Sequence, residues 1–136
     1  MEEATITEPP PSRWAIAVAW LEENSRSIPI LTRDYLCSKC AKKLASGKME
    51  TSPEALIAQI QNCCSRSKGF ISSRLPILES AFRLFLANGN QPITLEEMGQ
   101  KLSDLRGGDP YRTNPYVLYR LLKSDSYYGI QEITGD

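Results

Sequence analysis

The stretch FRLFLANGNQPITLEEMGQKL, residues 82–102, decides how the chain folds. Its apolar residues recur at helical spacing up to residues 88–89 (NG), a pair typical of a helix end because glycine readily adopts a left-handed conformation. Residues 91–93 (QPI) then predict a short extended piece. Thr94 and Glu97 have the spacing of a capping box, which predicts the start of a second helix. The stretch therefore predicts a helix, a short strand and another helix in succession.

Regular elements are also predicted on both sides of this stretch. The first predicted helix extends over residues 75–88. The second predicted helix, which begins at the capping box, is followed by a loop over residues 106–112 (RGGDPYR). Asn114 can then cap a third helix with Pro115 at its first position. Residues 127–133 alternate as a terminal strand. The predicted inward stripes are Leu78, Ala81, Phe82 and Phe85 in the first helix, Leu95, Met98, Leu102 and Leu105 in the second, and Val117, Leu118, Leu121 and Leu122 in the third.

With this order of elements, residues 75–133 resemble the winged helix-turn-helix superfamily. More narrowly, they resemble the HARE-type helix-turn-helix domain, a fold also found in the delta subunit of bacterial RNA polymerase. The resemblance is carried by a Gly-x-x-Pro-Ile step at residues 89–93, a capped second helix, and a proline-started third helix that ends in a strand. It implies a role in transcription, through binding DNA or a partner protein.

The outward side of the third helix is the candidate recognition surface. Arginine and lysine contact phosphates or guanine, asparagine can pair with adenine, and tyrosines can pack on sugars or stack. The alternative is that the tyrosines cover neighbouring loops and that Arg120 and Lys123 stabilise the helix C-terminus through the macrodipole. The candidates are Arg112, Thr113, Asn114, Tyr116, Tyr119, Arg120 and Lys123.

The N-terminal half is predicted to be helical as well. Residues 1–11 are rich in proline and are expected to be a flexible tail, followed by a helix over residues 12–24. Residues 27–31 (SIPIL) contain a proline and predict a connector or an edge strand. A short helix is expected over residues 41–45. The sequence TSPE at residues 51–54 begins a further helix, whose last turn delivers a pair of cysteines.

The cysteine spacing is the most specific chemical signal in the chain. Cys37 and Cys40 are separated by two residues, and after 22 intervening residues come the adjacent Cys63 and Cys64. Because the chain has no histidine, these four thiolates match the ligand number of a closed tetrahedral zinc site. The adjacent pair can share one ion only if its helix frays or ends at Cys63, since successive helical side chains diverge by about 100°. An iron–sulfur cluster, free or core thiols, and a redox dithiol at the first pair remain alternatives.

The length and composition support one compact fold. The 136 residues are 41% hydrophobic and 24% charged, close to the average for globular proteins. The predicted fold class is mainly α. A helical N-terminal half, clamped by a four-cysteine metal site, packs on a winged-helix-like C-terminal half with a small β element. The predicted organisation is a tail (1–11), a helical cysteine-containing region (12–74) and a winged helix-turn-helix-like region (75–136) that we expect to fold independently.

Several classes of function are disfavoured. The lack of histidine excludes Ser-His and Cys-His catalysis, and no paired carboxylates or phosphate-binding glycine loop are evident, so neither an enzyme nor a small-molecule substrate is predicted. The zero net charge means that nucleic-acid binding must depend on a local patch. One such patch is a basic stretch, for which a solvated helix face is the alternative. It contains Arg33, Lys39, Lys42, Lys43 and Lys48, joined by Arg66, Lys68 and Arg74 if a metal ion brings the segments together.

The beginning of the chain is acidic and proline-rich, so no secretory signal is expected, and the longest apolar run, residues 14–21, is too short to span a membrane. We expect a cytoplasmic protein without membrane contact. The predicted function is a non-catalytic zinc-binding recognition module that binds DNA or the transcription machinery. The alternatives are a protein–protein interaction adaptor without nucleic-acid binding, and an iron–sulfur or thiol redox protein.

Overall fold

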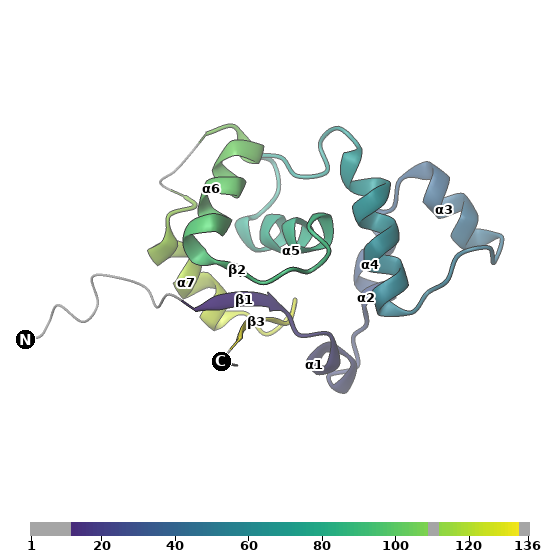
Figure 1. The fold of residues 1–136 in the computed structure, drawn as a ribbon, viewed down its shortest axis with the longest axis horizontal. Coiled ribbons are helices and arrows are strands. Elements are labelled where there is room, and N and C mark those ends of the chain that lie inside the picture. The colour runs from purple at the N-terminus through teal and green to yellow at the C-terminus, as the bar shows by residue number, and fades with distance from the viewer. Residues whose placement is uncertain (1–11, 109–111, 134–136) are drawn as a thin grey trace, which may run out of the picture.

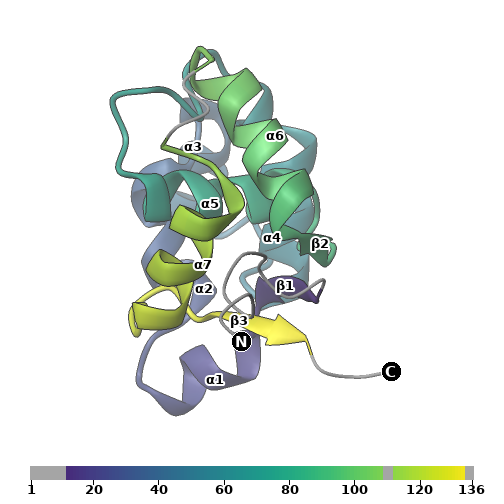
Figure 2. The same ribbon diagram turned by 90° about the vertical axis from the view of Figure 1, so that its left-hand side faces the viewer.

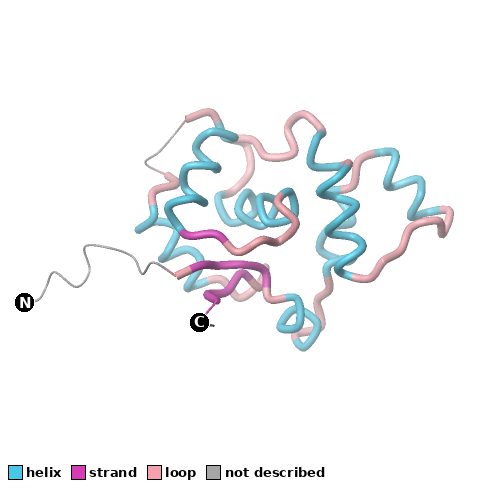
Figure 3. Tube along the Cα trace, viewed as in Figure 1, coloured by secondary structure: helices cyan, strands magenta, loops and turns pink. Residues whose placement is uncertain are grey.

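The computed structural model describes residues 12–108 and 112–133, and the tail predicted over residues 1–11 lies outside them. This part is mainly helical with a small antiparallel sheet, as predicted (Figures 1 and 3). The α-helices are α1 (Val18–Glu23), α2 (Ile28–Thr32), α3 (Ser38–Ala45), α4 (Pro53–Asn62), α5 (Ile77–Ala87), α6 (Leu95–Arg106) and α7 (Pro115–Ser124). Two short 3-10 helices are η2 (Arg33–Tyr35) and η3 (Cys64–Arg66), and the strands are β1 (Arg13–Ile16), β2 (Ile93–Thr94) and β3 (Ile130–Ile133). No helix in the described residues is long and apolar enough to cross a membrane.

The elements α5, β2, α6, α7 and β3 follow one another in the predicted order, and local capping fixes their boundaries. The Thr94 hydroxyl accepts a hydrogen bond from the Glu97 N–H, and the Glu97 carboxylate accepts one from the Thr94 N–H at 3.0 Å. The Asn114 side chain accepts from the N–H of Val117, with Pro115 at the first helical position. Both helix starts predicted from the sequence are confirmed.

The helix predicted over residues 12–24 is wrong in its first half, because Arg13–Ile16 is strand β1. This strand is the central one: it pairs antiparallel with both β2 and β3 (Figure 2). Trp14, Ala15 and Ile16 are all buried. A strand covered on both faces is continuously apolar, which does not differ in pattern from a buried helix. The two C-terminal strands are therefore joined by a strand from the N-terminal region.

A loop side chain extends the same sheet. The Asn90 side-chain oxygen accepts a hydrogen bond from the Ile16 N–H at 2.8 Å, and the Asn90 side-chain amide donates to the Ile16 carbonyl at 3.0 Å. The Ala17 N–H donates to the Gly129 carbonyl at 2.8 Å on the opposite side. The backbone of β1 is thus hydrogen-bonded on both sides, which ties the beginning of the described chain to its end.

The connector or edge strand predicted over residues 27–31 is wrong, because this segment forms helix α2. The Ser27 hydroxyl accepts from the Ile30 N–H, and Pro29 lies in the first turn, where a proline costs no intrahelical hydrogen bond. Ile28 and Thr32, one turn apart, are both fully buried. The short helix expected over residues 41–45 is present as α3, which begins earlier, at Ser38.

Helix α5 lies in the middle of the molecule, between α4 on one side and α6 with the sheet on the other (Figure 1). Its side chains are buried on several faces, and the buried residues of both halves form one continuous core. The largest fully buried side chains are Phe82, Phe85, Leu21, Ile28, Leu56, Ile60, Leu86, Leu95, Met98, Leu102, Leu118 and Thr32. The domain boundary predicted at residue 74 stays a prediction. The buried side chains on its two sides belong to the same hydrophobic core.

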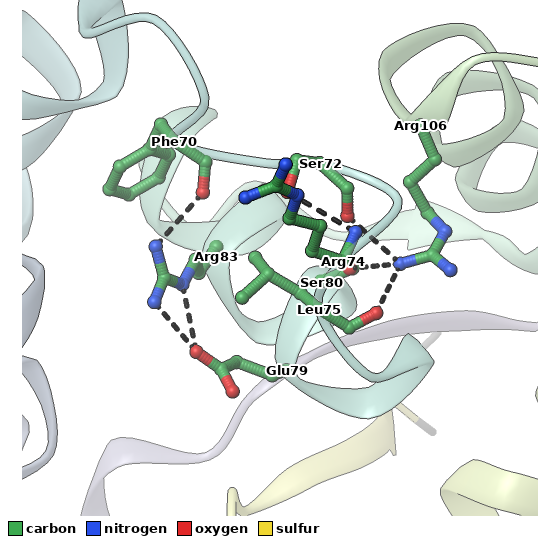
Figure 4. Close-up of polar contacts among 8 residues, drawn as sticks. All are labelled: Phe70, Ser72, Arg74, Leu75, Glu79, Ser80, Arg83 and Arg106. Atoms are coloured by element: carbon green, nitrogen blue, oxygen red, sulfur yellow. Dashed lines mark hydrogen bonds and ion pairs between the residues drawn. The ribbon is translucent and has the colours of Figure 1, made fainter.

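Two arginines fix the connector between α4 and α5 (Figure 4). Arg106, at the end of α6, donates to the carbonyls of Ser72 and Leu75 at 3.1 and 2.5 Å and to the Ser80 hydroxyl at 2.8 Å. Arg83 of α5 donates to the Phe70 carbonyl at 3.0 Å and to the Glu79 carboxylate at 2.6 Å. The sequence predicted Leu105 as a core residue, but Leu105 is 50% exposed and the neighbouring Arg106 is 6% exposed.

Replacing Arg106 with methionine is expected to lower the free energy of unfolding by about 3 kcal/mol. Methionine retains the apolar stem but leaves the Ser72 and Leu75 carbonyls and the buried Ser80 hydroxyl without this donor. Urea unfolding followed by circular dichroism measures the loss. Lys101→Met, an exposed position of the same helix, is the control and is expected to change stability by less than about 0.5 kcal/mol. Equal stability of the two variants would contradict a structural role for Arg106.

Candidate metal centre

The four cysteines meet where the beginning of α3 adjoins the end of α4. Cys37 is the residue before α3, and Cys40 lies in its first turn. Helix α4 ends at Asn62, so Cys63 (φ −129°, ψ −67°) has left the helix and Cys64 begins η3. The condition that the sequence set for the adjacent pair is therefore met: the helix ends before both cysteines, and their side chains are not held 100° apart.

The sulfur atoms lie at distances that suit one metal ion. The Sγ atom of Cys37 is 3.4 Å from that of Cys63 and 3.5 Å from that of Cys64. The Sγ atoms of Cys37, Cys40 and Cys63 all lie within 4.8 Å of one another. No disulfide forms among the four residues. The cysteines predicted as ligands are thus brought together and lie close enough to hold a metal ion.

Hydrogen bonds to sulfur surround the cluster. The Cys37 N–H donates to the Cys64 Sγ at 3.3 Å, and the Gln59 side-chain amide donates to the Cys40 Sγ at 3.2 Å. Such donors stabilise thiolates and orient them toward a metal ion. Gln59 was not predicted as a site residue. Its only signal in the sequence is its place one helical turn before Cys63.

The thiols of Cys37, Cys63 and Cys64 differ in their pKa values. The pKa of Cys37 is lowered to about 7, chiefly by a hydrogen bond from the Cys40 N–H. The pKa of Cys63 is raised to about 11, mainly because its thiol is hydrogen-bonded to Cys37, and burial raises the pKa of Cys64 to about 12. Cys37 therefore ionises more readily than Cys63 or Cys64 when no metal is bound. A bound cation would replace the other protons, since metal ligation requires thiolates.

The cluster also anchors α3 to the rest of the molecule. Cys40 is the buried residue of this eight-residue helix, which projects from the body beside α4 (Figure 1). The predicted basic residues Lys39, Lys42 and Lys43 are exposed on it. Because α3 contributes little other apolar surface, its position depends on what Cys40 contacts. The site can thus serve to hold the fold together.

The candidate residues of α7 and of the turn before it differ in their exposure. Arg112, Tyr116, Arg120 and Lys123 are exposed, as the sequence predicted. Thr113 is only 2% exposed, so its prediction as an outward-facing residue is wrong, and its carbonyl lies against Gly99 of α6. The side chain of Asn114 caps α7. The ring of Tyr119 packs edge-on against Trp14 with centroids 6.1 Å apart, and the Lys123 ammonium lies 5.4 Å from the Tyr119 centroid.

The inward stripe of α7 is narrower than predicted. Leu118 and Leu122 are buried, whereas Val117 and Leu121 are half-buried and line an open groove beside the beginning of α5. The exposed basic side chains of α7 therefore lie on a helix that is held to the core by one side only.

Comparison with known proteins adds no assignment, because no family model, curated protein or solved structure matches the chain.

Proposed function

We propose that this protein is a non-catalytic, zinc-binding recognition module that binds duplex DNA through its winged-helix-like C-terminal half. The observation that carries the proposal is α7. It follows α6 in helix-turn-helix order and presents Tyr116 and Arg120 to solvent, opposite the buried Leu118, while the exposed Arg112 lies in the turn before it. Exposed arginine on such a helix suits contacts to phosphates and base edges.

Zinc is the metal that the ligand set favours. Four thiolates without histidine or carboxylate form a closed tetrahedral site, and Zn–S bonds of about 2.3 Å place sulfur atoms about 3.8 Å apart. The distances from the Cys37 sulfur to those of Cys63 and Cys64, 3.4 and 3.5 Å, need little change to reach this value. A closed site of this kind supplies folding energy and no reaction.

Native mass spectrometry of protein purified without chelator is expected to find one zinc ion per chain, and the protein should show no visible absorption. Iron with visible absorption would replace the zinc proposal with an iron–sulfur protein. Four free thiols without metal would remove the metal centre from the proposal.

DNA binding is tested by removing two positive charges from α7. In Arg120→Gln/Lys123→Gln, the negative slope of log affinity against log salt for a duplex should become shallower by about two. The affinity at low salt should fall by about tenfold or more. Fluorescence anisotropy over a salt series measures both. The matched control Arg120→Lys/Lys123→Arg keeps the charges and should keep the slope. Unchanged binding by the glutamine variant would contradict the use of α7.

A protein partner is the second candidate. Leu105 is 50% and Tyr116 45% exposed, and exposed apolar and tyrosine side chains suit a protein interface. Weak binding of the wild-type chain to duplex without a salt slope would favour an adaptor that contacts a transcription-related protein.

A further inference from the structure

Two basic segments of the chain meet at the cysteine cluster. Residues 35–49 and residues 55–78 contain no aspartate or glutamate. The first segment contains α3, and the second contains most of α4 and all of η3. The sulfur atoms of Cys37 and Cys63, one from each segment, are 3.4 Å apart. The two segments therefore adjoin at the cluster, although about 25 residues separate these cysteines in the sequence.

The basic side chains near the cluster are directed to solvent. Three lysines of α3 stand at positions i, i+3 and i+4, which share one helix face. Each of them is exposed, whereas Cys40 on another face of α3 is fully buried. Two further exposed basic residues follow Cys64 within four positions. We call these five residues the α3–η3 surface: Lys39, Lys42, Lys43, Arg66 and Lys68.

The positive charge of this surface exceeds what the metal centre can neutralise. A divalent ion with four thiolates carries a charge of −2, so five basic residues leave an excess. Among the described residues, the carboxylate that forms an ion pair is Glu79, and its partner is Arg83. No described carboxylate pairs with the α3–η3 surface. Its charges are left for an anionic partner.

We propose that the metal centre joins these two segments into a second DNA-binding surface, which contacts the phosphate backbone at the end of the molecule opposite α7 (Figure 1). This inference rests on the proposed function. The surface holds lysine and arginine without exposed aromatic residues, so it suits phosphates and not base stacking. An anionic membrane fits less well, because Leu44 and Met49, the large apolar residues of the first segment near the lysines, are partly buried.

The test uses the full zinc-loaded chain and the triple variant Lys42→Gln/Lys43→Gln/Lys68→Gln, which leaves Lys39, between the first two cysteines, intact. The negative slope of log affinity against log salt for duplex binding is expected to become shallower by about 0.9 for each charge removed. The matched control Lys42→Arg/Lys43→Arg/Lys68→Arg keeps the charges and should keep the wild-type slope. Zinc content is measured for each protein, so that a lost metal is not mistaken for a lost contact.

Chelation provides a second readout. Removing the metal from the wild-type chain should lower the slope by as much as the glutamine substitutions, whereas chelation of the glutamine variant should lower it little further. An unchanged slope in the triple glutamine variant, with a shallower slope in Arg120→Gln/Lys123→Gln, would overturn this surface and leave α7 as the DNA-binding element. Absence of duplex binding by the wild-type chain would overturn both proposals. Binding to phosphatidylserine vesicles that depends on the three lysines, with an unchanged duplex slope, would assign the surface to membranes.

Discussion

Ala15→Pro is expected to lower the free energy of unfolding by about 3 kcal/mol or more, a large part of the total for a small domain. The Ala17 N–H donates to the Gly129 carbonyl, and antiparallel alternation places Ala15 opposite Gln131 in the next hydrogen-bonded pair. Proline removes that donor from the central strand. Urea unfolding followed by tryptophan fluorescence measures the loss, since Trp14 is buried beside the substitution.

Val18→Pro is the matched control, because it introduces the same residue three positions along. Val18 is the first residue of α1 and follows the non-helical Ala17, a position at which proline costs no helical hydrogen bond. This variant should stay within about 1 kcal/mol of the wild type. If Ala15→Pro were as stable as Val18→Pro, β1 would not be a structural element of the sheet.

The role of β1 also changes what we expect of a fragment. From the sequence, residues 75–136 have self-contained apolar stripes and are expected to fold alone. In the structure their two strands do not pair with each other, and β1 lies between them. Helix α5 also buries its side chains against α4. We therefore expect residues 75–136 to lack a cooperative unfolding transition when they are expressed without the N-terminal region.

The sequence predicted best what is decided locally. The capping box of Thr94 and Glu97, and the start of α7 at Asn114 and Pro115, depend on residues three or fewer positions apart. The same holds for Cys37 and Cys40, because their two-residue spacing predicted half of the cysteine cluster. Such signals act before any tertiary contact forms, so a pattern of a few residues is enough to read them.

What the sequence could not predict depends on distant partners. The run WAIA fits a buried helix as well as a central strand, and only its pairing with residues 93–94 and 130–133 decides between them. Arg106 is charged and was expected in a loop, yet three acceptors from residues 72–80 make its burial favourable. Thr113 was expected to face solvent, but α6 packs against it.

Replacing Cys40 with serine is expected to release α3 from the body of the molecule. If the site holds zinc, the free energy of unfolding should fall by about 4 kcal/mol or more. An isolated eight-residue helix is not stable in water, and Cys40 is the buried residue of α3. Hydrogen exchange should show residues 38–45 losing protection, while the amides of α5 and α6 exchange as in the wild type.

Ala41→Ser is the matched control, since it introduces serine at the next, exposed position of the same helix and should leave zinc content and exchange unchanged. Burial of a serine hydroxyl at residue 40 would itself cost stability, so the second arm is the wild-type chain treated with a chelator, in which every side chain is intact. Both arms should give the same exchange pattern, because each would remove the proposed ion between Cys40 and Cys63. Full protection of α3 after chelation would show that packing alone holds this helix, and that the four cysteines are core thiols and not ligands.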